Sequence, residues 1–247
     1  MDGRQWHRAI PGELIHSNEI HVWRAFLDLN SDQLARMAGM LSTDEVERAG
    51  RFRFERDQRR FIMARGILRE ILGRYLGKDP RTLRFDYTTY GKPLLSTSTG
   101  YDNIQFNLSH SDAFALYAFT PVRSIGIDIE LIRDDVAAEH IAQRFFSVSE
   151  ISLLEGIDQN KRAGAFFQYW TRKEAFLKAL GEGVSFPMEQ CDVSFINGSS
   201  WSPISMPGNI TACPCWYGQD LFPGPGYAAA ISAESGDLEL SYLDYAL

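Results

Sequence analysis

The feature that most constrains the fold is a helical pattern that occurs once in each half of the chain. Ser42–Glu45 and Ser147–Glu150 both read S-x-x-E, which is the spacing of a capping box at the start of a helix. Amphipathic helical sequence follows, through Leu76 in the first half and over Ala165–Leu180 in the second, and each stretch ends at a Leu-Gly pair. The repeat predicts a duplicated unit with two pseudo-symmetric lobes.

Strand-like sequence lies between the two helical stretches. Ile104–Leu108 alternates apolar and polar residues, and Phe114–Phe119 is a continuous apolar run, and both patterns are typical of strands in a partly buried sheet. Ser109–Ala113 consists mainly of turn-forming residues. We therefore predict a hairpin whose turn contains Ser109 and His110.

Two further strands are predicted near the C-terminus, at Tyr227–Ile231 and Leu238–Tyr242. A chain of 247 residues is long enough for two lobes that each bury a core. We predict an α+β fold of two pseudo-symmetric lobes, each a small, mainly antiparallel sheet packed against a long helix. Residues 1–122 form the N-terminal lobe with an arginine-rich helix, and residues 123–247 form the C-terminal lobe.

Composition and charge exclude several classes of protein. Apolar residues make up 45% of the chain, as in folded proteins, but no apolar run reaches the ~18 residues of a membrane helix. The N-terminus lacks the apolar core of a signal peptide, and three cysteines, an odd number, are consistent with a reducing cytoplasm. Cys213 and Cys215 lack the further ligands of a metal site. A net charge of −7 argues against general binding to nucleic acid or an anionic membrane.

Arginine is concentrated in the first helical stretch. The arginines are at positions 48, 51, 53, 56, 59, 60, 65, 69 and 74, with only three acidic residues among them. A solvated helix face is one explanation. The other is a polyanion site, because the planar guanidinium group suits phosphate oxygens and few local acids neutralise these charges. The acidic balance of the whole chain then favours a small phosphate-bearing ligand.

The segment Ile125–Glu130, I-G-I-D-I-E, alternates strictly between apolar and other residues. On a strand its isoleucines share one face, and Gly126, Asp128 and Glu130 share the other. Two neighbouring carboxylates repel each other unless a cation compensates them, and oxygen ligands favour Mg²⁺ or Mn²⁺. The alternative is an edge strand with a wet acidic face. Gly126 leaves room beside the carboxylates for a close approach.

A third carboxylate is predicted on the second helical stretch. Trp170, Glu174 and Lys178 recur at i, i+4 and i+8, so they share one helix face and present a carboxylate together with an ammonium group. An ordinary surface Glu–Lys pair is the alternative. His110, in its predicted turn, is a candidate phosphate or ribose contact. The sequence Gly91-Lys92-Pro93 predicts a turn before a strand, in which the rigid Pro93 holds Lys92.

Five motifs follow one another along the chain. They are G-K-P at 91–93, F-N-L-S-H-S at 106–111, I-G-I-D-I-E at 125–130, R-F-F-S-x-x-E at 144–150 and W-T-R-K-E-A-F-L-K at 170–178. This ordered set closely resembles the signature of the 4′-phosphopantetheinyl transferases, in particular the larger, surfactin-synthetase type. The similarity covers most of the chain between Ser42 and Pro187, and it implies the fold of that family.

The resemblance implies an enzyme that transfers the phosphopantetheine arm of coenzyme A to a serine of an apo acyl or peptidyl carrier protein and releases adenosine 3′,5′-bisphosphate. It implies Mg²⁺, or Mn²⁺, held by Asp128, Glu130 and Glu174. Asp128, Glu174 and Lys178 are the implied catalytic residues, with Glu174 a candidate base and Lys178 at the phosphate near the reacting centre. The implied coenzyme A ligands are Gly91, Lys92, Pro93, Ser109, His110 and Arg60.

Some assignments stay open within this resemblance. A metal lowers the proton affinity of a carboxylate ligand, so a water molecule that relays the proton is an alternative to Glu174 as the base. Where the family often has two basic residues before Arg60, this chain has Glu45 and Arg48, and neighbouring arginines are candidates to replace the missing cation. Glu150 is either an acidic residue near the site or a residue of the capping box.

Two other functions remain as alternatives. One is a Mg²⁺-dependent nucleotide phosphohydrolase, and the other is a non-catalytic module that binds coenzyme A or a carrier protein. The second is disfavoured because a module without activity has no need of a costly acidic cluster. The expected partners are coenzyme A and apo carrier proteins, without nucleic acid or membrane, and we expect a cytoplasmic monomer.

Overall fold

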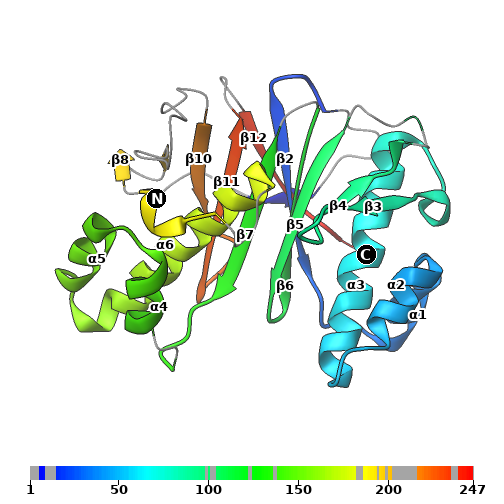
Figure 1. The fold of residues 1–247 in the computed structure, drawn as a ribbon. Helices are drawn as coiled ribbons and strands as arrows, with labels where there is room; N and C mark the ends of the chain where they lie inside the picture. Colours follow the sequence, from blue (N-terminus) through cyan, green and yellow to red (C-terminus); the bar gives the residue numbers. More distant parts are fainter. Residues whose placement is uncertain are drawn as a thin grey trace.

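The computed structural model describes residues 6–8, 15–97, 100, 104–121, 124–135, 138–181, 186–193, 195–197, 200–201, 216–234 and 239–246. Two five-stranded sheets lie side by side, with helices on their outer sides (Figure 1). The predicted α+β fold is therefore confirmed. Cys213 and Cys215 lie outside the described residues, and Cys191 is buried and free.

The elements of each half follow one another in a similar order. The first half contains β1 (His7–Arg8), β2 (Glu19–Phe26), α1 (Ser31–Ala38), α2 (Thr43–Ala49), α3 (Glu55–Leu76), a 3₁₀ turn (Pro80–Thr82), β3 (Phe85–Tyr87), β4 (Pro93–Leu95), β5 (Gln105–Ser111) and β6 (Phe114–Thr120). The second contains β7 (Ile125–Leu131), α4 (Ala138–Phe145), α5 (Val148–Glu155), α6 (Gln159–Leu180), a 3₁₀ turn (Met188–Gln190), β8 (Phe195–Asn197), β9 (Ser200–Trp201), β10 (Trp216–Leu221), β11 (Tyr227–Glu234) and β12 (Glu239–Asp244).

The two sheets differ in how they are assembled. The first has the strand order β1-β12-β2-β6-β5, and the second has the order β7-β11-β10-β9-β8. The second is antiparallel throughout, whereas β12 pairs in parallel with both β1 and β2. Strand β12 thus returns to the sheet of the first half, and the predicted division of the chain at residue 122 does not apply to this strand. Its buried Tyr242 and Leu243 complete the cores on the two faces of that sheet.

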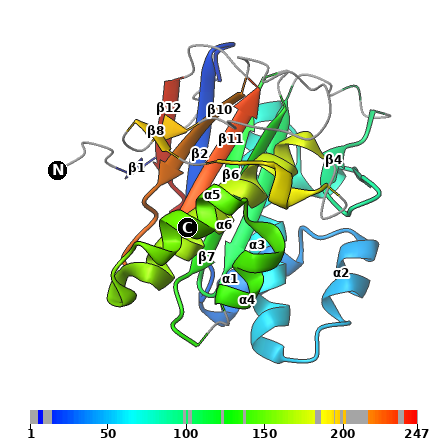
Figure 2. The same ribbon diagram turned by 60° about the vertical axis from the view of Figure 1, so that its left-hand side comes forward.

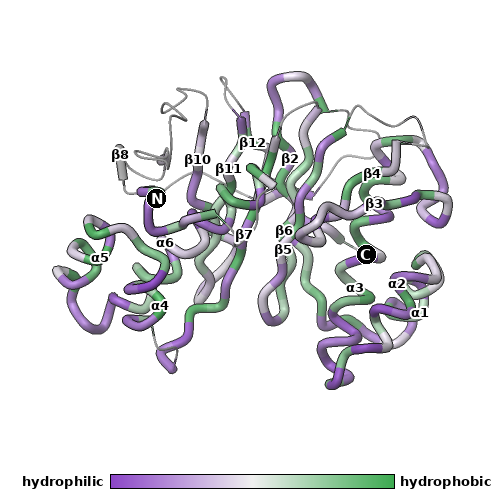
Figure 3. The backbone as a smooth tube through the Cα atoms, viewed as in Figure 1, coloured by the Kyte–Doolittle hydropathy of each residue, from purple (hydrophilic) through white to green (hydrophobic). Residues whose placement is uncertain are grey.

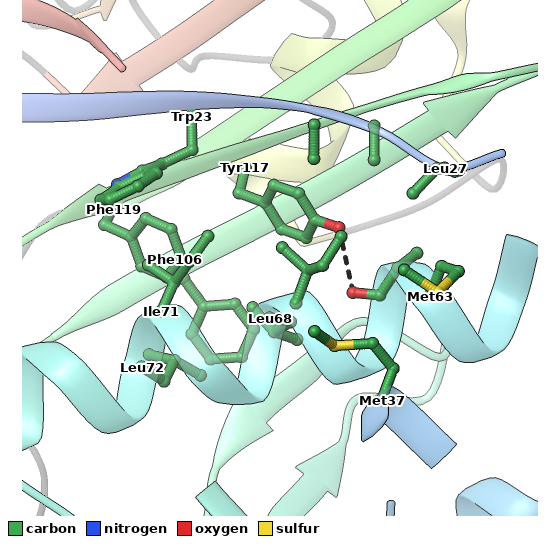
Figure 4. Packing of buried hydrophobic residues seen from close by; sticks show 14 of the residues in the cluster. Trp23, Leu27, Met37, Met63, Leu68, Ile71, Leu72, Phe106, Tyr117 and Phe119 are labelled. Carbon is green, nitrogen blue, oxygen red and sulfur yellow. Dashed lines mark hydrogen bonds between the residues drawn. The ribbon is translucent and has the colours of Figure 1, made fainter. Parts of the chain in front are cut away.

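Three apolar clusters join the layers in the order α3, first sheet, second sheet, α6 (Figures 1 and 2). Burial of these apolar side chains is the main force that holds the layers together. Figure 4 shows the cluster between α3 and the first sheet, where the Tyr117 hydroxyl also donates a hydrogen bond to the carbonyl of Ala64 at 3.0 Å. Strands β5 and β7 are the edge strands that meet where the two sheets adjoin.

Both predicted capping boxes form, at Ser42 before α2 and at Ser147 before α5. The first helical stretch is nevertheless two helices, because the chain leaves helical geometry after Ala49 and the ring of Phe52 packs against Phe61 of α3 with centroids 5.2 Å apart. In the second half α6 begins earlier than predicted, at Gln159. Both long helices end at glycines in the left-handed region, Gly77 at φ 62° and Gly181 at φ 78°, as the Leu-Gly pairs predict.

The predicted hairpin forms, but its turn is shorter than expected. Strand β5 extends to Ser111, and Asp112, at φ 49°, makes the turn with Ala113. Ser109 and His110 are therefore strand residues, paired with Leu116 and Ala115 of β6. Ser109 resembles turn sequence because the contact that holds its side chain comes from Asp128 of β7 and not from neighbours in the chain.

Hydrophilic residues are frequent in the outer helices, whereas the central strands are largely apolar (Figure 3). Within the described residues, none of the helices combines the length and the apolar character needed to cross a membrane.

Candidate active site

A cavity of about 500 Å³ lies between the two halves of the chain. The first half contributes residues of α2, α3, the β3–β4 loop and β5, and the second half contributes the last turns of α6. The lining residues are Arg48, Phe52, Phe61, Ala64, Arg65, Tyr87, Thr88, Tyr90, Gly91, Lys92, Pro93, Asn107, Leu108, Ser109, His110, Glu174, Leu177, Lys178 and Gly181. Seven residues predicted from the sequence are thus brought together around one space.

Strand β7 presents its two carboxylates toward α6. Its three isoleucines are buried between the sheets, so Gly126, Asp128 and Glu130 project to the opposite face, as the alternating pattern predicts. A Cβ atom on Gly126 would lie 2.0 Å from the carbonyl oxygen of Ala175. Glycine at this position therefore allows the backbone of α6 to pack directly on β7.

Asp128 is almost fully buried, with 3% of its surface exposed. Its Oδ1 atom accepts hydrogen bonds from Lys178 Nζ at 2.7 Å and from Ser109 Oγ at 2.8 Å. Its Oδ2 atom is buried and has no hydrogen-bond partner. A buried carboxylate oxygen without a partner is costly, so this atom is a candidate ligand for a cation.

Glu130 is held in a similar way. Its Oε2 atom accepts a hydrogen bond from Ser111 Oγ at 2.7 Å. Burial and the charge of Asp128 raise the pKa of Glu130, while the hydrogen bond from Ser111 and the charge of Lys178 act in the opposite direction. The cross-strand neighbour of Glu130 on β11 is Ala228, so that strand supplies no compensating charge.

Glu174 of α6 completes the acidic cluster. Burial, followed by the charges of Asp128 and Glu130, raises the pKa of Glu174 to about 7, against the opposing charge of Lys178. Such a shift is typical of a functional site and indicates that a proton or a cation is needed here. The three carboxylates therefore act electrostatically on one another, as the sequence predicts.

The donor set suits a small divalent cation, although it is not preorganised as a metal site. Among the described residues, no group of three or more His, Cys, Asp or Glu side chains is arranged to hold a metal ion. The charge of Asp128 is instead compensated by Lys178 at 2.7 Å. Carboxylate oxygens are nevertheless the ligands that Mg²⁺ prefers, and the unpartnered Oδ2 atom of Asp128 and the raised pKa of Glu174 both fit such a cation.

Lys178 does not form the surface pair with Glu174 that the sequence left open. Its ammonium group donates to Asp128, to Ser109 Oγ at 3.0 Å and to the carbonyl of Ile127 at 3.3 Å. The ammonium group is partly exposed and lines the cavity. It is therefore both a partner of β7 and a cation available to a phosphate in the cavity.

The G-K-P segment is a turn before a strand, as predicted, with Gly91 at φ 80° and Pro93 as the first residue of β4. The Lys92 ammonium group donates to the carbonyls of Ile125 at 3.0 Å and of Lys178 at 2.6 Å. Burial and the nearby charge of Lys178 lower the pKa of Lys92 to about 8. Lys92 thus connects the first half to both β7 and α6.

His110 lies on β5 at the rim of the cavity, exposed at its surface. Desolvation of the ring, followed by the positive charges of Lys178 and Arg60, lowers the pKa of His110. The neutral imidazole is therefore favoured, which can accept a hydrogen bond at one nitrogen and donate one at the other.

Three of the nine arginines, Arg60, Arg65 and Arg69, are neutralised by acids that lie outside the arginine-rich stretch. Arg60 is held by Asp28 at 2.7 Å and by Asp112 at 2.7 Å, and it lines a second cavity of about 500 Å³ that shares His110 with the first. The expectation that the arginines lack neutralising partners is therefore wrong for Arg60. To bind a phosphate, the guanidinium group of Arg60 would have to release one of these two carboxylates.

A third acid neutralises two further arginines. Buried Glu45 pairs with Arg65 and Arg69, with hydrogen bonds of 2.7 and 2.6 Å. Arg48 lines the cavity, stacks over the ring of Phe61 and has no ion pair among the described residues. Among the described residues, Arg48 is therefore the arginine lining this side of the cavity whose charge is not compensated by an acid.

Glu150 belongs to the scaffold and not to the cavity. It completes the capping box of α5, pairs with buried Lys173 at 2.8 Å and accepts a hydrogen bond from the amide of Val193 at 2.9 Å. Burial raises the pKa of Glu150. The capping interpretation of this residue is the correct one.

Asn107 and Ser111 were not among the site residues predicted from the sequence. Asn107 accepts a hydrogen bond from the amide of Ile127 at 2.8 Å, and Ser111 binds Glu130. Together with Ser109, these residues alternate along β5 and share one face. Polar residues at i, i+2 and i+4 on a strand beside a carboxylate strand would have indicated them.

Similarity to known proteins agrees with this geometry. Residues 124–232 match the 4′-phosphopantetheinyl transferase superfamily, and residues 28–122 match the N-terminal region of 4′-phosphopantetheinyl transferases. The chain is 39% identical to 4′-phosphopantetheinyl transferase HetI of Nostoc sp. (strain PCC 7120), over 92% of each chain. It is 30% identical to 4′-phosphopantetheinyl transferase Sfp of Bacillus subtilis (strain 168), over 87% of this chain and 93% of that protein.

This similarity identifies the chain as a transferase, and its cavity lies between two halves whose elements follow a similar order. The chain belongs to the 4′-phosphopantetheinyl transferase family, and the resemblance found in its motifs is confirmed.

Proposed function

We propose that this enzyme transfers the 4′-phosphopantetheine arm of coenzyme A to a serine of an apo acyl or peptidyl carrier protein and releases adenosine 3′,5′-bisphosphate. Family membership supports the reaction. The observation that carries it is the cavity between the halves, which Lys178 and Glu174 line, with the carboxylates of Asp128 and Glu130 on β7 close enough to repel Glu174. Such a charge arrangement suits a pyrophosphate with its cation.

Asp128, Glu130 and Glu174 are the residues that would hold Mg²⁺, or Mn²⁺. The unpartnered Oδ2 atom of Asp128 and the raised pKa of Glu174 support this assignment. When bound, the metal supplies positive charge that offsets the negative charge on the pyrophosphate oxygens. Metal binding would also remove the repulsion among the three carboxylates.

In the transfer, the serine oxygen of the carrier bonds to the phosphorus that bears pantetheine, and the bond from that phosphorus to the bridging oxygen breaks. Lys178 is the chain's own cation for the negative charge that develops on the leaving oxygen. The serine proton passes either to Glu174 or to a water molecule that relays it. The raised pKa of Glu174 supports this role in the metal-free site, and a bound cation would lower its proton affinity, which favours the route through water.

The remainder of coenzyme A would occupy the cavity beyond Lys178. Gly91, Lys92 and Pro93 would border the adenine, and Ser109 and His110 would contact the nucleotide phosphates and ribose. Arg60 is a proposed ligand of the 3′-phosphate, in exchange for Asp28 or Asp112. Arg48 can reach such a phosphate without breaking an ion pair, since it has none among the described residues.

The test is the intact mass of an apo carrier protein after incubation with this enzyme, coenzyme A and Mg²⁺. A gain of one phosphopantetheine that is lost with a chelator would support the proposal. Coenzyme A cleavage without carrier modification would indicate a nucleotide phosphohydrolase, and intact coenzyme A with several unmodified carriers would indicate a binding module.

Variants separate the assigned roles from general effects on folding. Glu174→Gln should stop transfer, because it removes both a metal ligand and a proton acceptor. Glu70→Gln is the matched control, because Glu70 lies at an equivalent place near the end of α3, away from the cavity lining. Unchanged turnover in Glu174→Gln would refute both roles of Glu174.

Size-exclusion chromatography with light scattering tests the expected monomer, and fractionation of cells tests the expected cytoplasmic location.

A further inference from the structure

The two sheets are joined at their adjoining edges by side chains and not by a backbone ladder. Strands β5 and β7 belong to different sheets but lie in contact. Three alternate residues of β5, Asn107, Ser109 and Ser111, each hydrogen-bond to β7. We call these three residues the β5 seam. The seam connects the halves at the place where the two strand carboxylates lie.

At Ser111 the direction of the hydroxyl hydrogen is determined by its neighbours. The amide of Leu131 donates to Ser111 Oγ at 3.0 Å, so the oxygen is used as an acceptor on that side. Its single hydrogen is then directed to Glu130 Oε2, at 2.7 Å. A donor aimed at this oxygen favours the ionised carboxylate and restricts its rotation.

The two carboxylates of β7 are held in the same way. Asp128 has one oxygen bound by Ser109 and the other without a partner. Glu130 has one oxygen bound by Ser111, and this is its only hydrogen bond to a side chain in the described part of the protein. Ser109 also accepts from Lys178 and lines the cavity, whereas Ser111 does not line that cavity. Ser111 lines the second cavity instead, together with Arg60 and His110, so Mn²⁺ binding measured without coenzyme A tests it separately from the substrate contacts.

We propose that Ser111 is a positioning residue, whose hydroxyl group, held by the Leu131 amide, orients Glu130 and thereby sets the affinity of the site for its divalent cation. Groups that orient metal ligands typically change metal affinity by about 10–100-fold when they are removed. This inference rests on the proposed metal-dependent transfer, which it deepens by assigning the support of one ligand. Ser111 itself touches neither the metal nor the substrate in this assignment.

The experiment makes two measurements on the full-length protein. Electron paramagnetic resonance of the free ion gives the affinity for Mn²⁺, and carrier modification gives the Mg²⁺ concentration needed for half-maximal activity. Ser111→Ala should weaken Mn²⁺ binding by about tenfold and raise the required Mg²⁺ concentration to a similar extent. The rate at saturating Mg²⁺ should largely recover. Ser111→Thr, which keeps the hydroxyl group, should restore the affinity.

The matched control is Ser232→Ala on β11. Ser232 is fully buried and its hydroxyl donates to the carbonyl of Tyr217 at 3.3 Å, so the variant removes a serine hydroxyl from the neighbouring strand without touching a carboxylate. Its Mn²⁺ affinity should equal that of the wild-type protein. If Ser111→Ala fails to fold, Ser111→Cys takes its place, since a thiol keeps the volume but is a weak donor.

Each outcome separates the two proposals. Unchanged Mn²⁺ affinity in Ser111→Ala, or an equal loss in Ser232→Ala, would overturn the positioning role and leave the proposed transfer intact. If the wild-type protein bound no Mn²⁺ and modified carriers without metal, both the metal assignment and the role of Ser111 would be overturned. Loss of affinity in Ser111→Ala alone, with recovery in Ser111→Thr, would support the proposal.

Discussion

The long helices α3 and α6 end alike and carry the same type of charged pair, yet the two pairs differ in role. Each helix has 22 residues and ends at a left-handed glycine. In the last turns of α3, Arg74 binds Glu70 at 2.5 Å. At the equivalent place in α6, Lys178 binds Asp128 of β7 at 2.7 Å, and the pKa of Glu174 is raised to about 7. The same local pattern is a surface ion pair in one half and part of the proposed reactive centre in the other, because β7 adds carboxylates.

The halves also differ in how they compensate charge. Beside the cavity in the first half, Glu45 lies between Arg65 and Arg69 and is compensated by both. Beside it in the second half, the charge of Lys178 opposes that of three carboxylates. Removing Glu45 should therefore destabilise the protein, whereas removing a carboxylate near Lys178 should relieve repulsion.

The largest expected effect is the loss of transfer in Asp128→Asn. The substitution removes the carboxylate with an unpartnered buried oxygen, and it should lower the transfer rate by at least about 100-fold. The fold should persist, because Lys178 keeps its hydrogen bonds to Ser109 and to the carbonyl of Ile127. Carrier mass spectrometry and circular dichroism measure the two effects, with Glu70→Gln as the control. Transfer within tenfold of the wild-type rate would contradict the assigned role of Asp128.

The second prediction concerns the buried acid of the first half. Glu45→Gln leaves Arg65 and Arg69 buried without their carboxylate, and it should lower the free energy of unfolding by about 3–5 kcal/mol. Urea denaturation at pH 8 measures the change. A loss below about 1 kcal/mol would show that the comparison between the halves is mistaken.

The third prediction is opposite in sign to the second: Glu174→Gln should raise the free energy of unfolding. The pKa of Glu174 is about 7 in the folded protein and near its ordinary value of 4.5 in the unfolded chain. The stability that comes from this protonated carboxyl group is fully present below pH 4.5 and is lost as the pH rises through 7. Without metal, Glu174→Gln should therefore be more stable than the wild-type protein at pH 8, by about 1–3 kcal/mol, and similar to it near pH 4.5.

Addition of Mg²⁺ sharpens this third comparison. The ion should stabilise the wild-type protein at pH 8 by mass action and should have a smaller effect on the variant, which lacks one carboxylate. Denaturant titrations at both pH values, with a chelator or with Mg²⁺, measure all four conditions. Equal stability of the two proteins at pH 8 in chelator would mean that Glu174 experiences no net repulsion.

The strand that carries the proposed metal ligands could be predicted from the sequence because its pattern is local. Alternation alone assigns the isoleucines of β7 to the core and Asp128 and Glu130 to the other face. The S-x-x-E and Leu-Gly signals likewise located helix ends, because caps depend on residues a few positions apart. The order of the motifs then supplied the family, and similarity to known proteins confirmed it.

The errors arose where the deciding contact is distant in the sequence. His110 was predicted in a turn because serine, histidine and aspartate favour turns, whereas β5 continues because its seam residues bind β7. The arginines looked uncompensated because Asp28, Asp112 and Glu45 lie outside the main cluster of charge. The return of β12 to the first sheet is equally non-local, since no short-range pattern specifies which sheet a strand joins.

The smallest expected effect tests the surface pair of α3. Arg74→Ala removes an exposed partner of Glu70, which keeps Arg36 at 3.1 Å and the Tyr245 hydroxyl at 2.9 Å. Exposed i,i+4 pairs contribute about 0.3–0.5 kcal/mol, so the free energy of unfolding should fall by that amount and the transfer rate should not change. Lys178→Ala, at the equivalent place in α6, should instead abolish most of the transfer, because its cation faces the reacting phosphate. A surface ion pair outside the cavity cannot act on a phosphate bound there. An equal loss of transfer in Arg74→Ala would therefore mean that the two helix ends do not differ in role.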